Sequence, residues 1–126
     1  GALRKAVGEH WAVLAKVRLS DVIHVPYGAP DRQAHRNRID RKHLDFILCA
    51  PADFAPLLAI ELDDSSHERF DRRRRDAFID SALEAAGLPL LRVPVRLVYD
   101  PAELRAQIDE RLRRNGILDD EEDVRL

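Results

Sequence analysis

The segment Ala59–His67 constrains the fold of this chain more than any other feature. It reads Ala-Ile-Glu-Leu-Asp-Asp-Ser-Ser-His, so an apolar run of branched residues ends in three carboxylates and an imidazole. A buried strand that ends in acids places negative charge at the mouth of a fold, where it is costly unless a positive group lies between the acids. A divalent metal ion is the obvious positive group, and phosphodiester hydrolysis is the obvious chemistry.

Composition limits the class of protein. The 126 residues are enough for one domain with its own hydrophobic core. The net charge of −2 gives no support for nucleic-acid binding by the surface as a whole, although five of the seven residues 69–75 are arginine. The lone Cys49 excludes a disulfide framework and favours a cytoplasmic location. No apolar run approaches the ~20 residues of a membrane span. The Gly-Ala start without Met suggests an excised or tagged fragment, and other domains of a longer chain are then candidate partners.

The first part of the chain predicts a helix, a strand and a loop. Leu3, Ala6 and Val7 have helical spacing, and the stretch from Val13 to Ile23 alternates between apolar and polar residues as a half-buried strand does. Residues 24–42 hold two prolines, a glycine and many basic side chains, which predicts a long exposed loop.

The remainder predicts two central strands, a helix, a strand and a helix. The nearly continuous apolar runs His43–Ala50 and Pro56–Asp63 are typical of buried strands and form an antiparallel hairpin around a short turn. A helix over residues 69–86 ends at Gly87, a strand follows over 88–93, and Asp100-Pro101 begins the last helix. The order α-β-β-β-α-β-α predicts a single α/β domain over residues 1–116 and a flexible acidic tail over 117–126.

The hairpin brings carboxylates together. If its turn is centred near Asp53, residue i pairs with residue 106 − i, and Asp45 lies across from Glu61. Opposed residues share a face with Cβ atoms roughly 4.5–5.5 Å apart, and Asp63 lies two residues further along the same face. Mg²⁺ or Mn²⁺ would reverse the repulsion among the three acids, and His67 would position or deprotonate a water beside the metal. A register slip of one residue would move Asp45 to the other face.

Four segments together resemble an uncharacterised bacterial family, the domain of unknown function twenty-seven twenty-six. The resemblance covers about residues 13–93. That family is similar to the PD-(D/E)XK nuclease superfamily, on the branch of the very-short-patch-repair endonucleases. The resemblance implies a restriction-endonuclease-like αβββαβ core with a central mixed sheet flanked by helices, a Mg²⁺ or Mn²⁺ cofactor, and DNA as substrate. The four segments are Leu44–Ile47, Ala59–Asp64 with His67, Arg75-Asp76 and Ala86–Arg92.

The resemblance also implies roles for single residues. Asp45 corresponds to the motif aspartate of the superfamily, Glu61 to its second metal-binding acid, and His67 to the catalytic histidine of the repair-nuclease branch. Asp63 stands where most of the superfamily has a lysine, and the proline of the superfamily's name is missing before Asp45. We therefore expect a Mg²⁺-dependent endonuclease in which His67 or an arginine compensates for the lysine. The alternative is a catalytically inactive nucleic-acid-binding or interaction module of a larger protein.

Two basic segments have both a functional and a structural interpretation. Arg72, Arg74 and Arg75 follow the acids directly and are suited to bidentate phosphate contacts, with DNA or RNA as the partner. The same arginines would also serve as a solvated helix face that pairs with neighbouring acids. The basic stretch 32–42 contacts a nucleic-acid backbone or is simply a soluble loop.

Overall fold

The computed structural model describes residues 1–23, 28, 30–63 and 69–118, with the backbone alone at residues 40 and 69–76. Four strands form one mixed sheet in the order β1-β2-β3-β4. The pairs β1–β2 and β2–β3 are antiparallel, whereas β3 and β4 are parallel because a helix crosses over between them. The strands are β1 Ala12–Arg18, β2 His43–Cys49, β3 Pro56–Asp63 and β4 Leu90–Pro94.

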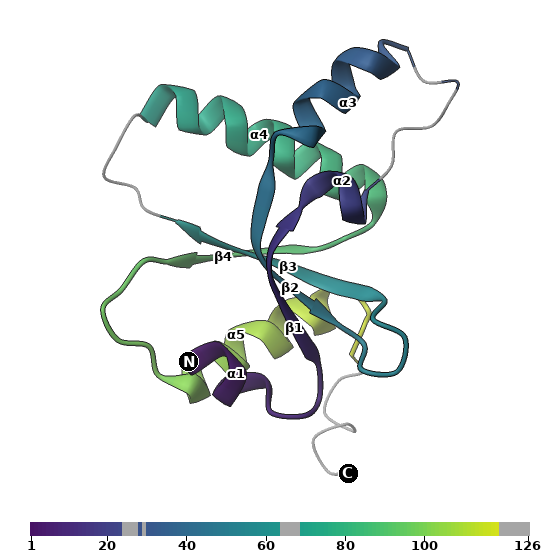
Figure 1. Cartoon of the computed structure of the whole chain (residues 1–126). Coiled ribbons are helices and arrows are strands. Elements are labelled where there is room, and N and C mark those ends of the chain that lie inside the picture. The colour runs from purple at the N-terminus through teal and green to yellow at the C-terminus, as the bar shows by residue number, and fades with distance from the viewer. Residues whose placement is uncertain (24–27, 29, 64–68, 119–126) are drawn as a thin grey trace.

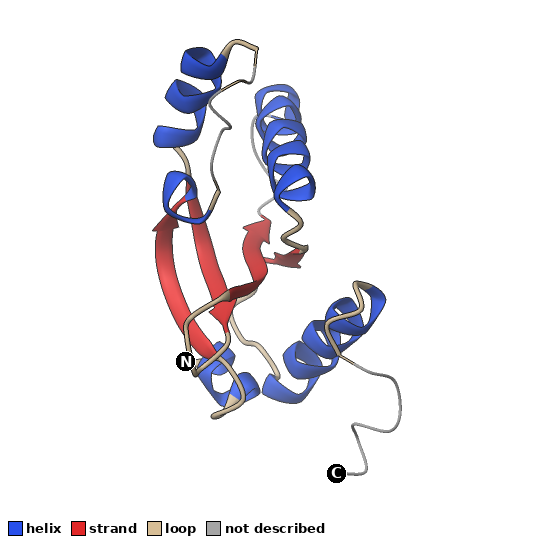
Figure 2. Cartoon of the chain, turned by 90° about the vertical axis from the view of Figure 1, so that its right-hand side faces the viewer, coloured by secondary structure: helices blue, strands red, loops and turns tan. Residues whose placement is uncertain are grey.

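Helices cover both faces of this sheet. Helices α1 and α5 lie on one face, and α2, α3 and α4 lie on the other (Figure 1 and Figure 2). The predicted α/β class with a central mixed sheet flanked by helices is therefore confirmed. The predicted order of elements is also present, with α2 and α3 inserted between β1 and β2. The helices are α1 Ala2–Val7, α2 Leu19–Val22, α3 Arg32–Asp40, α4 Arg69–Ala86 and α5 Pro101–Arg114.

The sheet separates two hydrophobic clusters. On the α1/α5 face, Leu58 and Ile60 pack against Ile108 and Leu112 of α5. On the α4 face, apolar side chains of β2 and β3 pack against Ile79 and Leu83 of α4. Both faces of the central strands are thus buried, which explains why β2 and β3 are nearly continuous apolar runs.

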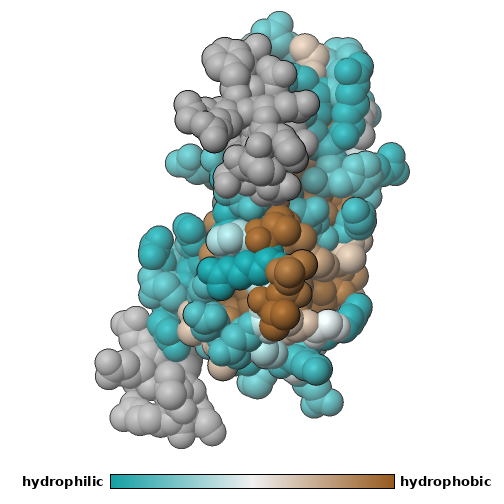
Figure 3. Space-filling model, turned by 90° about the vertical axis from the view of Figure 1, so that its left-hand side faces the viewer, coloured by the Kyte–Doolittle hydropathy of each residue, from teal (hydrophilic) through white to brown (hydrophobic). Residues whose placement is uncertain are grey.

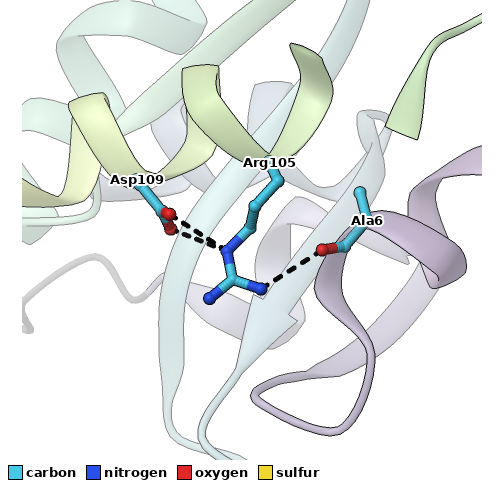
Figure 4. Close-up of polar contacts among 3 residues, drawn as sticks. All are labelled: Ala6, Arg105 and Asp109. Carbon is cyan, nitrogen blue, oxygen red and sulfur yellow. Dashed lines mark hydrogen bonds and ion pairs between the residues drawn. The ribbon is translucent and has the colours of Figure 1, made fainter. Parts of the chain in front are cut away.

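One arginine joins α5 to α1. Arg105 Nε lies 3.0 Å from both carboxylate oxygens of Asp109, and its Nη1 donates to the carbonyl of Ala6 over 3.3 Å (Figure 4). The guanidinium also lies 4.8 Å from the ring centroid of Trp11. Trp11 is buried in the α1/α5 cluster, as expected of a core residue. The two helices are therefore connected by polar as well as apolar contacts.

Two predictions for the first part of the chain are wrong. The strand expected over Val13–Ile23 ends at Arg18, because α2 begins at Leu19. Leu19 and the residue that follows α2, Ile23, are both buried, and the backbone N–H of Leu19 donates to the carbonyl of Lys42. The exposed loop expected over 24–42 contains α3, although residues 24–27 and 29 lie outside the described part. Helix α3 gives no apolar periodicity because Ile39 is its one residue described as buried.

The later elements follow the prediction closely. Helix α4 ends as expected at Gly87, whose φ of +74° lets its N–H donate to the carbonyl of Glu84 while Leu88 N–H donates to Leu83. The Asp100 side chain caps α5 by accepting from Ala102 N over 3.0 Å. Strand β4 begins two residues later than expected, at Leu90. Of the acidic tail, residues 119–126 lie outside the described part.

Within the described residues, no helix combines the length and the apolar character that a bilayer crossing requires.

Candidate carboxylate site

The register of the β2–β3 hairpin is the one predicted. Phe46 pairs with Ile60, Ile47 with Ala59 and Leu48 with Leu58, so each pair sums to 106. The next positions outward on the two strands are Asp45 and Glu61. A bulge shifts the register between Leu48 and Cys49, but it lies on the turn side of these pairs and leaves the acidic end unaffected.

The pleat of the sheet changes at Asp45. Phe46 and Leu48 face α1 and α5, yet Leu44 packs in the cluster on the α4 face, so the alternation reverses between them. Across the sheet, the pairs Ala15–Phe46 and Val17–Leu44 place Lys16 of β1 opposite Asp45. Lys16 has a φ of +53°, a left-handed conformation that is rare for a residue with a side chain. The irregularity therefore lies at the acid that the sequence singled out.

The Asp45 carboxylate reaches across to β3. Its Oδ2 accepts a hydrogen bond of 2.7 Å from the backbone N–H of Leu62, the residue after Glu61. A carboxylate that accepts from a backbone N–H makes a short and comparatively strong bond. The contact fixes the Asp45 carboxylate beside the end of β3 and leaves its other oxygen with acceptor capacity.

Glu61 is the one charged side chain among the described residues that is buried, with 9% of its surface exposed. Ile60 faces α1 and α5, Leu62 lines an apolar cavity with Ile60, and Ala59 packs on the α4 face. By alternation, Glu61 and Asp63 lie on the α4 face of the sheet. Asp63 is half-buried, and its carbonyl accepts from Val95 N over 3.2 Å at the end of β4.

An ion pair borders Glu61. Arg92 of β4 pairs with Glu61 in the parallel register, and its Nη1 donates to Asp80 Oδ1 of α4 over 2.8 Å. The pair connects the sheet to α4 on the same face as Glu61. The five ionisable groups of this region are Asp45, Glu61, Asp63, Asp80 and Arg92, and together they carry a formal charge of −3.

The structure describes only part of the predicted site. His67 lies outside the described residues, and the side chains of Arg72, Arg74 and Arg75 on α4 do too. Within the described ranges, no group of three His, Cys, Asp or Glu side chains is arranged to hold a metal ion. The structure therefore brings Asp45 and Glu61 to neighbouring positions on β2 and β3. That Asp63 is a third metal ligand and that His67 is catalytic stay predictions.

Apolar side chains are exposed where β3 and β4 end. The end of β3 and the connection from β4 to α5 expose Leu62, Val95, Leu97 and Val98, with Leu97 fully exposed. Figure 3 shows such an apolar patch on the side of the molecule where the two parallel strands end. The connection is held in place by Tyr99, whose hydroxyl donates to the carbonyl of Pro94 and accepts from Arg96 N. A second hollow, an open groove of about 560 Å³, is lined in part by Asp80 and Arg92.

Sequence reasoning gave no role to Lys16, Asp80 or Arg92. Arg92 is a single charged residue in an otherwise apolar strand, and this break in the apolar run could have marked it as a residue with a charged partner. Asp80 is 12 positions earlier on α4, so the pair follows only from the packing of α4 on β4. The left-handed conformation of Lys16 has no sequence signal, because it is neither Gly nor Asn.

Cys49 takes no part in this site. It is buried at the opposite end of β2, and burial raises the pKa of its thiol. A protonated, buried thiol is unreactive, so Cys49 is a core residue and not a nucleophile.

Comparison with known families gives one match. A family model described as "Protein of unknown function (DUF2726)" matches residues 1–112. No curated protein and no solved structure matches the chain. The match agrees with the family resemblance found in the sequence, whereas the relation of that family to nucleases stays a prediction.

Proposed function

We propose that this chain, which belongs to the DUF2726 family, is a metal-dependent nuclease-fold domain that hydrolyses phosphodiester bonds in DNA. The observation that carries the proposal is the position of Asp45 beside a buried Glu61 at the end of two central strands. Acids that serve only solubility face water, whereas a buried carboxylate next to a second one costs free energy. Such an arrangement is typical of a site that binds a cation or substrate.

The donor set fits a hard divalent cation. Mg²⁺ prefers oxygen ligands and keeps several waters, so one or two carboxylates are enough to bind it. Asp45 and Glu61 would supply those carboxylates, with Asp63 as a third or water-mediated ligand. The formal charge of −3 in the region favours a cation, and the Asp45–Leu62 contact orients one ligand in advance. When bound, the metal would lower the pKa of a water and stabilise charge on the phosphate.

Other residues of the chain would complete the site. His67 follows Glu61 by six positions and would orient or deprotonate the attacking water. Arg72, Arg74 and Arg75 lie in the first turns of α4, directly after the acidic segment, and would hold the phosphodiester. Arg92 is held by Asp80, so it would fix the position of β4 beside Glu61 and leave substrate binding to the α4 arginines.

The lysine that most of the related nucleases carry is replaced by Asp63. Lys16 offers a substitute, since its backbone lies opposite Asp45 in the β1–β2 register and its side chain is exposed. A cation there would stabilise the hydroxide that attacks the phosphate. Its left-handed conformation supports a functional role, because a conformation that costs energy persists where the surrounding structure requires it.

A nuclease assay tests the proposal. Plasmid and single-stranded DNA are incubated with Mg²⁺ or Mn²⁺ and with wild type, Glu61→Gln, or the control Glu84→Gln, which removes an exposed acid near the other end of α4. We expect Glu61→Gln to abolish cleavage and Glu84→Gln to leave it unchanged. Equal cleavage by both variants would remove Glu61 from the site and refute the proposal.

The second candidate is a nucleic-acid-binding module without catalysis. It is favoured by the absence, within the described ranges, of three ligands arranged around a metal, and by Asp63 at the lysine position. Such a module would bind DNA in a salt-dependent way with and without Mg²⁺ and would cleave nothing. Wild-type DNA binding without any cleavage in the same assay would decide for this candidate.

A further inference from the structure

Helix α3 differs in composition from the rest of the chain. Residues 31–42 carry five cationic side chains against two carboxylates, a formal charge of +3, whereas the whole chain has a net charge of −2. The helix stands out from the body at one end of the molecule, on the same side of the sheet as α4 (Figure 1 and Figure 2). Its contacts with the body are few. Ile39 is buried, and Arg38 and Lys42 lie over the ring of Phe78 at 3.8 and 5.5 Å from its centroid.

Three exposed arginines on and directly after α3 are not paired with acids as the arginines of α5 are. In α5, Arg105 pairs with Asp109 and Arg114 with Glu110, each four positions apart. No ion pair in the described part of the chain involves Arg36, Arg38 or Arg41, which are all exposed.

Like charges four residues apart disfavour a helix, and α3 contains one such pair, Arg32 with Arg36. A helix this short is marginal without tertiary packing, and α3 has little packing. A polyanion bound along the helix would neutralise the exposed Arg36, Arg38 and Arg41.

The arrangement of side chains around α3 suits a groove. At 100° per residue, Gln33, Asn37 and Arg41 point away from the buried Ile39, while Arg36 and Arg38 lie on the two flanks. Gln33 and Asn37 are hydrogen-bonded to each other over 3.0 Å and are exposed. Cations on both flanks and Arg41 at the end of the helix match the phosphate backbones that border a groove, and the amide side chains of Gln33 and Asn37 match base edges.

We infer that α3 is a DNA-docking helix that enters the major groove of double-stranded DNA. The major groove of B-DNA is about 12 Å wide and admits an α-helix. The major groove of an RNA duplex is too narrow for side chains to enter. Single strands are bound through stacking on aromatic side chains, and α3 has none among its exposed residues apart from His35. The inference rests on the proposed function for its DNA partner and names duplex DNA as the substrate class.

The test measures binding by wild type, Arg36→Gln/Arg41→Gln and the control Arg113→Gln/Arg114→Gln on α5. Both double variants remove the same charge. The probes are a short fluorescein-labelled DNA duplex, its single strand, and the RNA duplex of the same sequence, titrated without metal between about 50 and 200 mM salt. Wild type is expected to prefer the DNA duplex.

Each phosphate contact contributes about 0.9 to the slope of log affinity against log salt. Loss of both contacts lowers that slope by about 2 and weakens duplex binding about 60-fold at 0.1 M salt. The α5 control keeps the wild-type slope. Equal losses in the two double variants, equal binding of all three probes, or no duplex binding by wild type would each overturn the inference.

Two further variants keep this outcome separate from the proposed function. The first is the single variant Arg41→Gln. Arg41 lies directly after the last residue of α3, and its loss is expected to lower the salt slope by about 1. The test therefore does not depend on the folding of the double variant. Glu61→Gln is expected to bind duplex with the wild-type slope while failing to cleave it. If Glu61→Gln cleaves DNA normally while the α3 variants still lower the salt slope, the proposed catalytic site is refuted and the docking role of α3 stands. If Glu61→Gln fails to cleave but the α3 variants keep the wild-type slope, only the docking role of α3 is refuted.

Discussion

Replacement of Asp45 by Ala tests whether this acid supports the fold as well as the site. The mutation removes the 2.7 Å hydrogen bond from Leu62 N, which joins β2 to β3 across 17 residues of sequence. Hydrogen bonds to charged groups contribute about 1.5–3 kcal/mol. Leu62 is 41% exposed, so water can replace the lost acceptor, and we expect a loss near the lower value, about 1.5 kcal/mol.

The expected change in melting temperature follows from the size of the chain. Unfolding entropy is about 2.1 cal/mol/K per residue, or about 0.26 kcal/mol/K for 126 residues, so Asp45→Ala should melt about 6 °C below wild type. Asp45→Asn keeps an acceptor oxygen and should lose less than half of that. Differential scanning calorimetry in EDTA measures the effect without metal.

The control is Asp53→Ala. Asp53 also accepts from a backbone N–H, that of Ala55 at 3.0 Å, but within an exposed turn and two residues away. We expect a decrease of about 2 °C or less, since surface substitutions change stability by about 0.5 kcal/mol. If Asp45→Ala melts within about 1 °C of wild type, the contact with Leu62 does not stabilise the hairpin and the reasoning from its geometry is refuted.

Three further predictions concern the backbone, the core and the thiol. Lys16→Val should destabilise the protein by about 1–2 kcal/mol in urea unfolding despite the high β-propensity of valine, because a β-branched residue is disfavoured at positive φ; an unchanged midpoint would contradict the left-handed conformation. Leu83→Ala should cost about 2–5 kcal/mol, whereas Leu97→Ser should stay within about 0.5 kcal/mol, and comparable losses would show that Leu97 is not exposed as described. Burial raises the pKa of the Cys49 thiol, so unfolding releases a proton as the pH rises through the ordinary value of 9.0, and stability should fall above that pH. Cys49→Ala should reduce this alkaline decrease in unfolding titrations, and an identical decrease in the variant would exclude Cys49 as its cause.

Much of the fold follows from the sequence because apolar patterning determines it locally. Strands β2 and β3 are short apolar runs on either side of a turn, and the centre of that turn predicts the register from Leu48–Leu58 to Phe46–Ile60. The ends of α4 and α5 follow from Gly87 and from Asp100-Pro101, whose conformational preferences are intrinsic. These signals depend only on neighbouring residues.

The errors arise where tertiary contacts decide. Helix α3 has no apolar stripe, and its tertiary contacts, the packing of Arg38 on Phe78 and the burial of Ile39, leave no pattern in the sequence. The alternation in β1 predicted a longer strand, but Leu19 is buried against the α4 face and begins α2. The pairing of Arg92 with Asp80 and the contact of Asp45 with Leu62 join residues 12 and 17 positions apart, and no local pattern encodes either contact.

The most direct test of the carboxylate pair is a crystal structure of the protein soaked with Mn²⁺, with anomalous diffraction recorded at the manganese edge. We expect one anomalous peak between Asp45 and Glu61, at about 2.1 Å from an oxygen of each carboxylate. The same soak of Glu61→Gln crystals should show no peak there. Wild-type crystals in which Asp45 contacts only Leu62 N and no manganese lies beside Glu61 would contradict the proposal that these two acids bind a cation.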